Sequence, residues 1–256
     1  MSTRLRILAA TLGGAVLVSG ALLGAVAPVA AAGSTGTTTH TGPCATEQAA
    51  YKASETVANG IALGGCLITQ RLDYLSKATT RVQDSKVLTS ADRSALATIL
   101  ANDTSGLTAL KSTVDGETSL SAVQADLHAI VSQYRVFRLV ARQVALVSQA
   151  DAVGAAVARY TGTVSPRLEA RIQAAAAKGR NTTAAAAALA AMNRAVSAAS
   201  SDVSGLSARV LALTPAEYDA HHARPVLVRA ETAVLRARAQ LLDARADALR
   251  VVIRLR

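Results

Sequence analysis

Apolar residues between Leu189 and Leu213 recur at alternating steps of three and four positions. This spacing puts them along one side of a helix, and it is the heptad pattern of helices that pack lengthwise on other helices. Such a line is costly to leave in water, so the other segments are expected to pack against it. The line consists of Leu189, Met192, Val196, Ala199, Val203, Leu206, Val210 and Leu213.

Two more helices are predicted ahead of this segment. One runs from about Leu67 to near Leu88, with apolar residues at helical spacing. The next begins at Thr89 or Ser90, where the residues resemble a capping box, and it ends at Asp115-Gly116. The capping residues and the Asp-Gly pair act within a few residues, so they predict where the second helix begins and ends.

A third helix begins at Ser119 or Ser121 and has an apolar face that reaches Tyr134 and can continue to Val147. A further apolar line follows, and it is interrupted at Ser165-Pro166. A proline there either begins a new helix or kinks an existing one, and the pattern does not distinguish the two.

The stretch after this proline ends at Lys178-Gly179, which is typical of a C-terminal cap. Thr182 or Thr183 then begins the helix that carries the line from Leu189 onward. Thr214-Pro215 ends that helix and begins a short helical turn.

The last helix is predicted from Arg224 or Pro225 to the C-terminus, and its pattern is the most regular in the chain. A second line beside the main one widens its apolar stripe, which should therefore face two neighbouring helices. The main line consists of Leu227, Ala230, Val234, Ala237, Leu241, Ala244, Ala248, Val251 and Leu255. The second line consists of Val228, Leu235, Leu242 and Leu249.

These elements predict an all-α fold, an elongated antiparallel helical bundle with coiled-coil-like heptad seams. Short connections make successive helices antiparallel, and helices of roughly 25–30 residues would be ~40 Å long. Composition agrees, because 51% of the residues are hydrophobic and only 2% are aromatic. A core of Ala, Val and Leu lets helices approach closely.

The first 32 residues have the pattern of a signal peptide. Arg4 and Arg6 precede an apolar stretch, and small residues at Ala30–Ala32 form a cleavage site. An uncleaved membrane anchor is the alternative, since about 20 apolar residues can span a bilayer. Cleavage would lower the formal net charge from +10 to +8, because residues 1–32 hold two arginines and no acid.

A Gly/Ser/Thr-rich tether at 33–43 precedes a single helical-bundle domain at 44–256. Export makes a disulfide between Cys44 and Cys66 plausible. A continuous helix would hold their Cα atoms ~30 Å apart, whereas a bridge needs ~7 Å. The chain is therefore expected to double back near Asn59-Gly60, and unpaired thiols are the alternative.

Several short stretches resemble secreted all-helical proteins of high-GC Gram-positive bacteria, a group with no assigned activity. They are Thr89–Asp92, Asp103, Gly106–Lys111, Tyr134–Val140 and Ala150-Asp151. The chain departs from that pattern at Arg142, where a proline is expected, so a helix break there can be missing. The resemblance implies an exported helical protein and carries over no catalytic residue.

No constellation of catalytic or cofactor-binding residues is recognisable. The four histidines are His40, His128, His221 and His222, and none stands in a metal-binding motif. The adjacent pair His221-His222 is expected in a solvated turn, with a weak metal site as the alternative. The sequence therefore predicts a protein that is not an enzyme, with no catalytic, metal or cofactor-binding residues and no cofactor.

Asp103 and Asp151 occupy apolar stripe positions, and Arg135 and Arg138 lie in an apolar region. A partly buried charge needs a partner, because an unpaired one is costly to desolvate. One hypothesis is that Asp103 or Asp151 pairs with Arg135 between helices. The alternative is that all of them keep their charged ends in water.

The last helix is strongly basic, with eight arginines and three acids between Arg224 and Arg256. These arginines either form a solvated face that pairs with acids of neighbouring helices or contact an anionic surface. The candidate anion contacts are Arg229, Arg236, Arg238, Arg245, Arg250 and Arg254.

The first functional reading is an exported, non-enzymatic helical bundle, secreted or at the cell envelope, that contacts a protein or an anionic polymer there. The second is a basic module that binds anions or a membrane surface through the last helix. The third is an unrecognised enzyme or metal carrier. Nucleic acid is a less expected partner, because almost no aromatic residue is present for base stacking.

Overall fold

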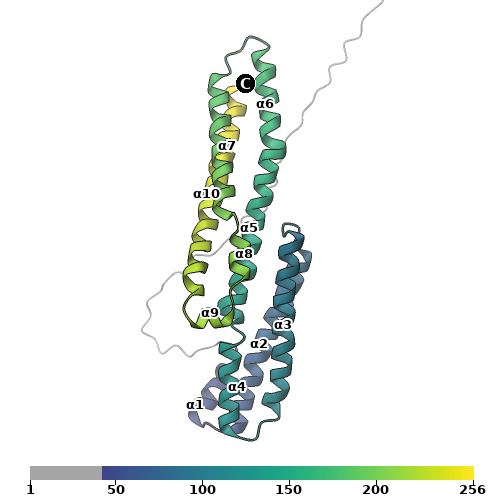
Figure 1. Ribbon diagram of the computed structural model, residues 1–256, viewed down its shortest axis with the longest axis vertical. Helices are drawn as coiled ribbons and strands as arrows, with labels where there is room; N and C mark the ends of the chain where they lie inside the picture. Colours follow the sequence, from purple (N-terminus) through teal and green to yellow (C-terminus); the bar gives the residue numbers. More distant parts are fainter. Residues whose placement is uncertain (1–41) are drawn as a thin grey trace, which may run out of the picture. The chain divides into compact units, whose positions relative to one another are not determined.

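The computed structural model describes residues 42–256, and this part of the chain is built from helices without any β-strand (Figure 1). The predicted signal peptide, its alternative as an anchor, and tether residues 33–41 lie outside the described residues. Between residues 42 and 256, no helix is both long and apolar enough to cross a membrane. The elements are α1 (Ala45–Ala53), α2 (Val57–Asp84), α3 (Ser90–Asp115), α4 (Leu120–Ser132), the π-helical turn η1 (Val136–Val140), α5 (Ala141–Arg159), the π-helical turn η2 (Tyr160–Val164), α6 (Ser165–Ala176), α7 (Thr183–Val203), α8 (Leu206–Leu211), α9 (Pro215–Asp219) and α10 (Ala223–Arg254).

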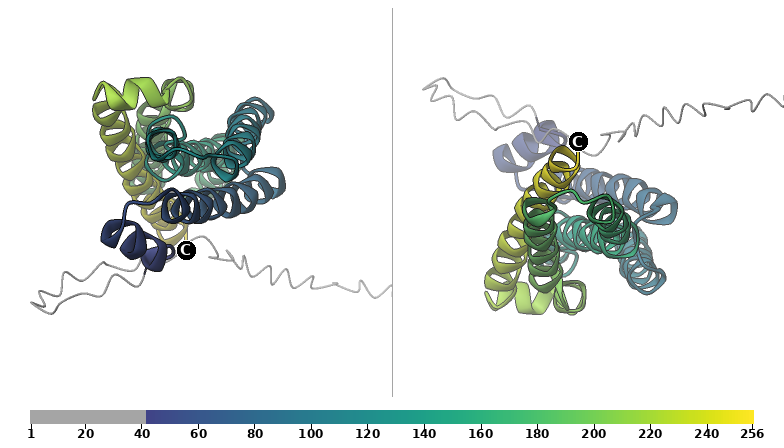
Figure 2. Two further views of the ribbon diagram at one scale, coloured as in Figure 1. Left: turned by 90° about the horizontal axis from the view of Figure 1, so that it is seen from below. Right: turned by 90° about the horizontal axis from the view of Figure 1, so that it is seen from above.

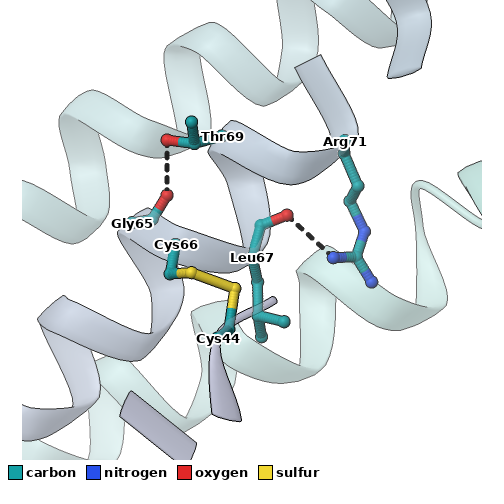
Figure 3. Close-up of a disulfide and its surroundings, with 6 residues drawn as sticks. All are labelled: Cys44, Gly65, Cys66, Leu67, Thr69 and Arg71. Atoms are coloured by element: carbon teal, nitrogen blue, oxygen red, sulfur yellow. Dashed lines mark hydrogen bonds between the residues drawn. A yellow bond between two sulfur atoms is a disulfide. The ribbon is translucent and has the colours of Figure 1, made fainter. Parts of the chain in front are cut away.

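The predicted pairing of the two cysteines is confirmed, since Cys44 and Cys66 form a disulfide with their Cα atoms 5.7 Å apart (Figure 3). The chain doubles back earlier than expected, at residues 54–56, where Thr56 caps the start of α2. Gly60 lies inside α2 instead of in the turn, and it packs against Val123 of α4. Its missing side chain thus serves close helix packing, which sequence spacing alone does not separate from a turn.

The predicted ends of α3 and the start of α4 are confirmed by their caps. The Thr89 hydroxyl accepts a hydrogen bond from the backbone N–H of Asp92 at 3.1 Å, and α3 ends at Asp115. Ser119 caps α4 in the same way. Apolar residues of α2 and α3 form much of the largest core, including Leu75, Leu96, Leu100, Leu107 and Val114.

The third predicted helix does not continue unbroken to Val147. It ends at Ser132, Arg135 leaves the helical conformation, and η1 leads into α5. Tyr134 packs directly against Gly106 of α3, where any added Cβ would collide with its ring. A contact between residues far apart in sequence thus accompanies the break, which lies upstream of Arg142.

Pro166 neither begins a separate helix nor ends the helical path of the backbone. The backbone remains helical through Val164 and Ser165, and α6 continues from α5 (Figure 1). Proline cannot donate to the preceding turn, and the wider π-helical turn η2 directly before it accommodates that loss. The predicted C-cap is confirmed at Gly179, where the backbone N–H of Arg180 donates to Ala175.

The line from Leu189 to Leu213 is not on one helix, contrary to the prediction. The chain breaks at Ser204-Gly205, and Gly205 adopts a left-handed conformation with φ of 62°. Most of α7 packs on α10, as Figures 1 and 2 show, whereas α8 contacts α5 more extensively. Leu206 and Val210 are still buried, so the apolar pattern was correct while the helix was not continuous.

Candidate docking surface on α10

The last helix begins and runs as predicted, and its main apolar line is covered by the neighbouring helices. Leu227, Ala230, Val234, Ala237, Ala244 and Val251 are all buried. The second line is not covered, contrary to the prediction. Val228, Leu235, Leu242 and Leu249 are 46%, 64%, 62% and 56% exposed.

Smaller side chains alternate with these large ones along the same side of α10. Thr232, Ala239 and Ala246 are exposed, and Ile253, which follows at the same spacing, is 65% exposed. Successive positions are four and three residues apart, so about one of them falls on each turn and together they form one continuous ridge. We call this set the bare ridge: Val228, Thr232, Leu235, Ala239, Leu242, Ala246, Leu249 and Ile253.

Arginines border the bare ridge on both sides. Positions directly after its large residues carry Arg229, Arg236 and Arg250, with Asp243 between the last two. Positions three after them carry Glu231, Arg238 and Arg245. Every one of these arginines is exposed, and so is Arg254 near the end of the helix.

Part of this charge is compensated within the protein. Arg236 pairs with Asp202 of α7 at 3.1 Å, and Arg250 pairs with Asp247 on its own helix. Among the described residues, no carboxylate lies within 4.0 Å of Arg229, Arg238, Arg245 or Arg254. The expectation of a face that pairs with neighbouring helices therefore holds for Arg236 but not for these four arginines.

The carboxylate of Glu231, which borders the bare ridge, is neutralised by an arginine of a neighbouring helix. The guanidinium of Arg142 on α5 donates to its carboxylate through Nη2 at 2.6 Å and through Nε at 3.0 Å. Arg142 is the position at which the resemblance to secreted all-helical proteins predicts a proline. This ion pair neutralises the charge of one of the two acids that border the bare ridge. The surface is therefore more basic than the charged residues of α10 alone indicate.

A hollow of about 630 Å³ lies beside the bare ridge, between α8 and α10. The helix break at Gly205 lies beside it, between the lining residues Asp202 and Leu206, and α8 contacts α5 more extensively than α10. Its floor includes the buried Leu206 and Val210, and Arg209 joins the arginines of α10 around it. The residues that line it include Val228, Arg229 and Arg236.

A shallower hollow of about 250 Å³ lies on the other side, between α5 and α10, and Leu235 lines it. Neither hollow is lined by histidine or cysteine. The carboxylates in their linings, Asp202 and Glu231, are both paired with arginine. This chemistry suits the binding of apolar and acidic groups better than proton transfer.

The hypothesis that Arg135 pairs with Asp103 or Asp151 is wrong. Arg135 pairs with Asp219 of α9 and also lies over the ring of Tyr218. Asp151 accepts the backbone N–H of Thr89 at 2.8 Å instead. The end of α4 at Ser132 explains this difference, because Arg135 then leaves the helix face on which the pairing was predicted.

Asp103 has no partner for its buried Oδ2 atom. Burial raises the pKa of this carboxyl to about 6. Tyr134 lies close to it, and the pKa of Tyr134 is raised by burial and by the charge of Asp103. The stripe position of Asp103 predicted its partial burial correctly, but no arginine compensates it.

Sequence reasoning missed two buried polar residues. The Gln143 amide of α5 donates to the backbone carbonyls of Val210 and Leu213, which ties α8 to α5. Arg71 of α2 is buried and donates to the Leu67 carbonyl at 2.9 Å (Figure 3). Its guanidinium also lies over the ring of Phe137. Burial lowers the pKa of Arg71. Neither position is marked by a motif, because the Gln143 acceptors and the Phe137 ring beside Arg71 are distant in sequence.

The histidines are not brought together into a site. His128 is exposed on α4, His221 and His222 are exposed around the turn before α10, and His40 lies outside the described residues. Within residues 42–256, the one group of three close metal-ligating side chains is Cys44, Glu47 and Cys66. Its two sulfurs are bonded to each other, so they are not thiolate ligands.

Comparisons of the chain with protein-family models, with curated proteins and with solved structures find no match.

Proposed function

We propose that this chain is an exported, non-enzymatic helical protein that acts by contact at the cell envelope through the bare ridge of α10. The resemblance to secreted helical proteins and the signal-peptide pattern support export. On this proposal the helices form an elongated antiparallel bundle held by heptad seams, and α10 carries a second seam for a partner.

The observation that carries this proposal is the regular exposure of the bare ridge. Isolated apolar residues on a surface are common, but a straight line of them along one helix marks an interaction surface. Leu235 and Leu242 are 64% and 62% exposed. Burying the exposed part of either side chain against a partner would contribute roughly 1 kcal/mol. A partner along the whole helix would gain several such contributions.

Binding to an anionic membrane surface is the second candidate. The uncompensated charges of Arg238, Arg245 and Arg254 favour it, because basic residues beside exposed leucines suit anionic lipid headgroups above an apolar layer. The two candidates share the bare ridge and differ in the nature of the partner.

The test is sedimentation of the mature chain with isolated cell envelope from the native host. We expect Leu235→Gln together with Leu242→Gln to weaken binding by about tenfold or more, because two apolar contacts are lost. Val131→Gln is the matched control, since Val131 is 44% exposed on α4, away from the ridge, and should leave binding unchanged.

Unchanged binding of the double variant would overturn the proposal. Vesicles of phosphatidylglycerol and of phosphatidylcholine form the second arm. Ridge-dependent binding to the anionic vesicles, abolished by several hundred millimolar salt, would replace protein contact with the membrane reading.

A further inference from the structure

We infer that the occupant of the bare ridge is a single amphipathic helix of another protein, whose own apolar seam is bordered by Glu and Asp. This inference rests on the proposed function and specifies its partner. It depends on three features of the surface: the alternation of large and small residues, the hollows on both sides, and the distribution of charge.

The alternation of side-chain sizes fits a helix. Leu235, Leu242 and Leu249 alternate with Ala239 and Ala246, so the ridge offers large knobs with shallow gaps between them. Large residues of a facing helix fit into such gaps, and small residues let the two backbones approach. Fluid lipid chains do not require this regularity. From Val228 to Ile253 the ridge is ~38 Å long along the axis.

The two hollows widen the surface on which a helix would lie. Val228 lines the larger hollow beside α8, and Leu235 lines the smaller one beside α5. Side chains that flank the seam of a docked helix would point towards these hollows. On the α8 side they would meet Arg209 and Arg229 beside the Arg236–Asp202 ion pair, so acidic side chains are favoured there.

Charge also sets the composition of the partner. Residues beside a heptad seam meet the corresponding residues of the facing helix and determine which helices pair. Here they include five arginines and two acids. Arg142 pairs with Glu231, Asp202 with Arg236 and Asp247 with Arg250. Among the described residues, Arg229, Arg238 and Arg245 have no carboxylate partner, so the border of the ridge keeps a positive charge. A second copy of this chain would bring two surfaces of like net charge together, whereas an acidic helix would complement it.

The experiment measures binding of two synthetic helical peptides to the full mature chain by fluorescence anisotropy at low ionic strength. Both peptides have four heptads with the same Leu/Ala seam, and they carry Glu or Lys beside it. We expect the Glu peptide to bind at least about tenfold more tightly. Arg238→Glu combined with Arg245→Glu should reduce this preference or reverse it.

Arg171→Glu combined with Arg194→Glu is the matched control, because it makes the same change of charge at exposed positions of α6 and α7. It should leave the preference intact. Equal binding of the two peptides, binding of neither, or sedimentation of the wild-type chain as a ridge-dependent dimer would overturn the inference. If envelope binding still required Leu235 and Leu242, the proposed function would stand without it.

Discussion

Asp103 is a side chain whose burial makes the folded chain less stable when the carboxyl is charged. It lies on α3 at a stripe position, and its Oδ2 atom is buried without a hydrogen-bond donor. A charged carboxylate there has lost water and gained no partner, which explains why its pKa rises to about 6. One hypothesis gave Asp103 or Asp151 as the partner of Arg135, but Arg135 pairs with Asp219 and leaves Asp103 uncompensated.

The pKa of Asp103 predicts a definite pH dependence of stability. The folded chain holds this proton more tightly than the unfolded chain, whose value is near 3.8, so the stability contribution falls as pH rises from about 4 to about 6. Asp103→Asn removes the charge. We expect it to raise the free energy of unfolding by roughly 1 kcal/mol at pH 7.5, after allowance for solvent screening, and to have little effect at pH 4.

Urea denaturation at the two pH values measures this difference. Asp73→Asn, at an exposed position of α2, is the control and should change stability little at either pH. A loss of stability at pH 7.5 in Asp103→Asn would show that the carboxylate has a stabilising partner after all.

Helix breaks show what decides the structure at the level of elements. Caps such as Thr89 and Thr214 act within three residues, and both were recognisable in the sequence. The breaks at Arg135 and at Gly205 were missed, because the apolar pattern continues across each of them. Glycine alone does not mark a break, since Gly154 lies within the helical conformation of α5.

Substitution by alanine is therefore expected to have opposite effects on stability at Gly205 and at Gly154. Gly205 has φ of 62°, where an alanine side chain costs roughly 1 kcal/mol or more. Gly154 lies in α5, and an added Cβ there would meet nothing within 4 Å, so Gly154→Ala should stabilise the chain by about 0.5–1 kcal/mol. Thermal unfolding of both variants tests this, and a shift of the same sign in both would contradict it.

Stability is distributed unevenly over the described part of the molecule. None of the residues of α1 is buried, and Cys44, directly before it, is bonded to Cys66 of α2. α2, α3, α5, α8 and the first part of α10 contribute to one large core, whereas α7 meets the rest of α10 along smaller clusters. The attachment of α1 thus depends more on the disulfide and the Asn59 side chain, which donates to Ala50 and Ser54, than on burial.

Removal of the disulfide should consequently release α1 first. The bridge joins residues 22 positions apart, and a loop of this length stabilises by roughly 3 kcal/mol through the unfolded chain. We expect Cys44→Ser with Cys66→Ser to lower the free energy of unfolding by about that amount and to abolish amide-exchange protection in α1 before other helices. Protection in α1 equal to the oxidised wild type would contradict this.

Sequence alone was enough for the helical class, for the capped helix starts at Thr89, Ser119 and Thr214, and for the burial of the main apolar line of α10. These features depend on apolar spacing and on hydrogen bonds within a few residues, which act wherever the chain folds. Tertiary structure decided the rest. Two apolar lines of α10 have the same seven-residue repeat, and only the positions of α5, α6, α7 and α8 left one of them bare. The ion pairs of Arg135 and Arg142 join residues 84 and 89 positions apart, so their partners became neighbours only through the packing of whole helices.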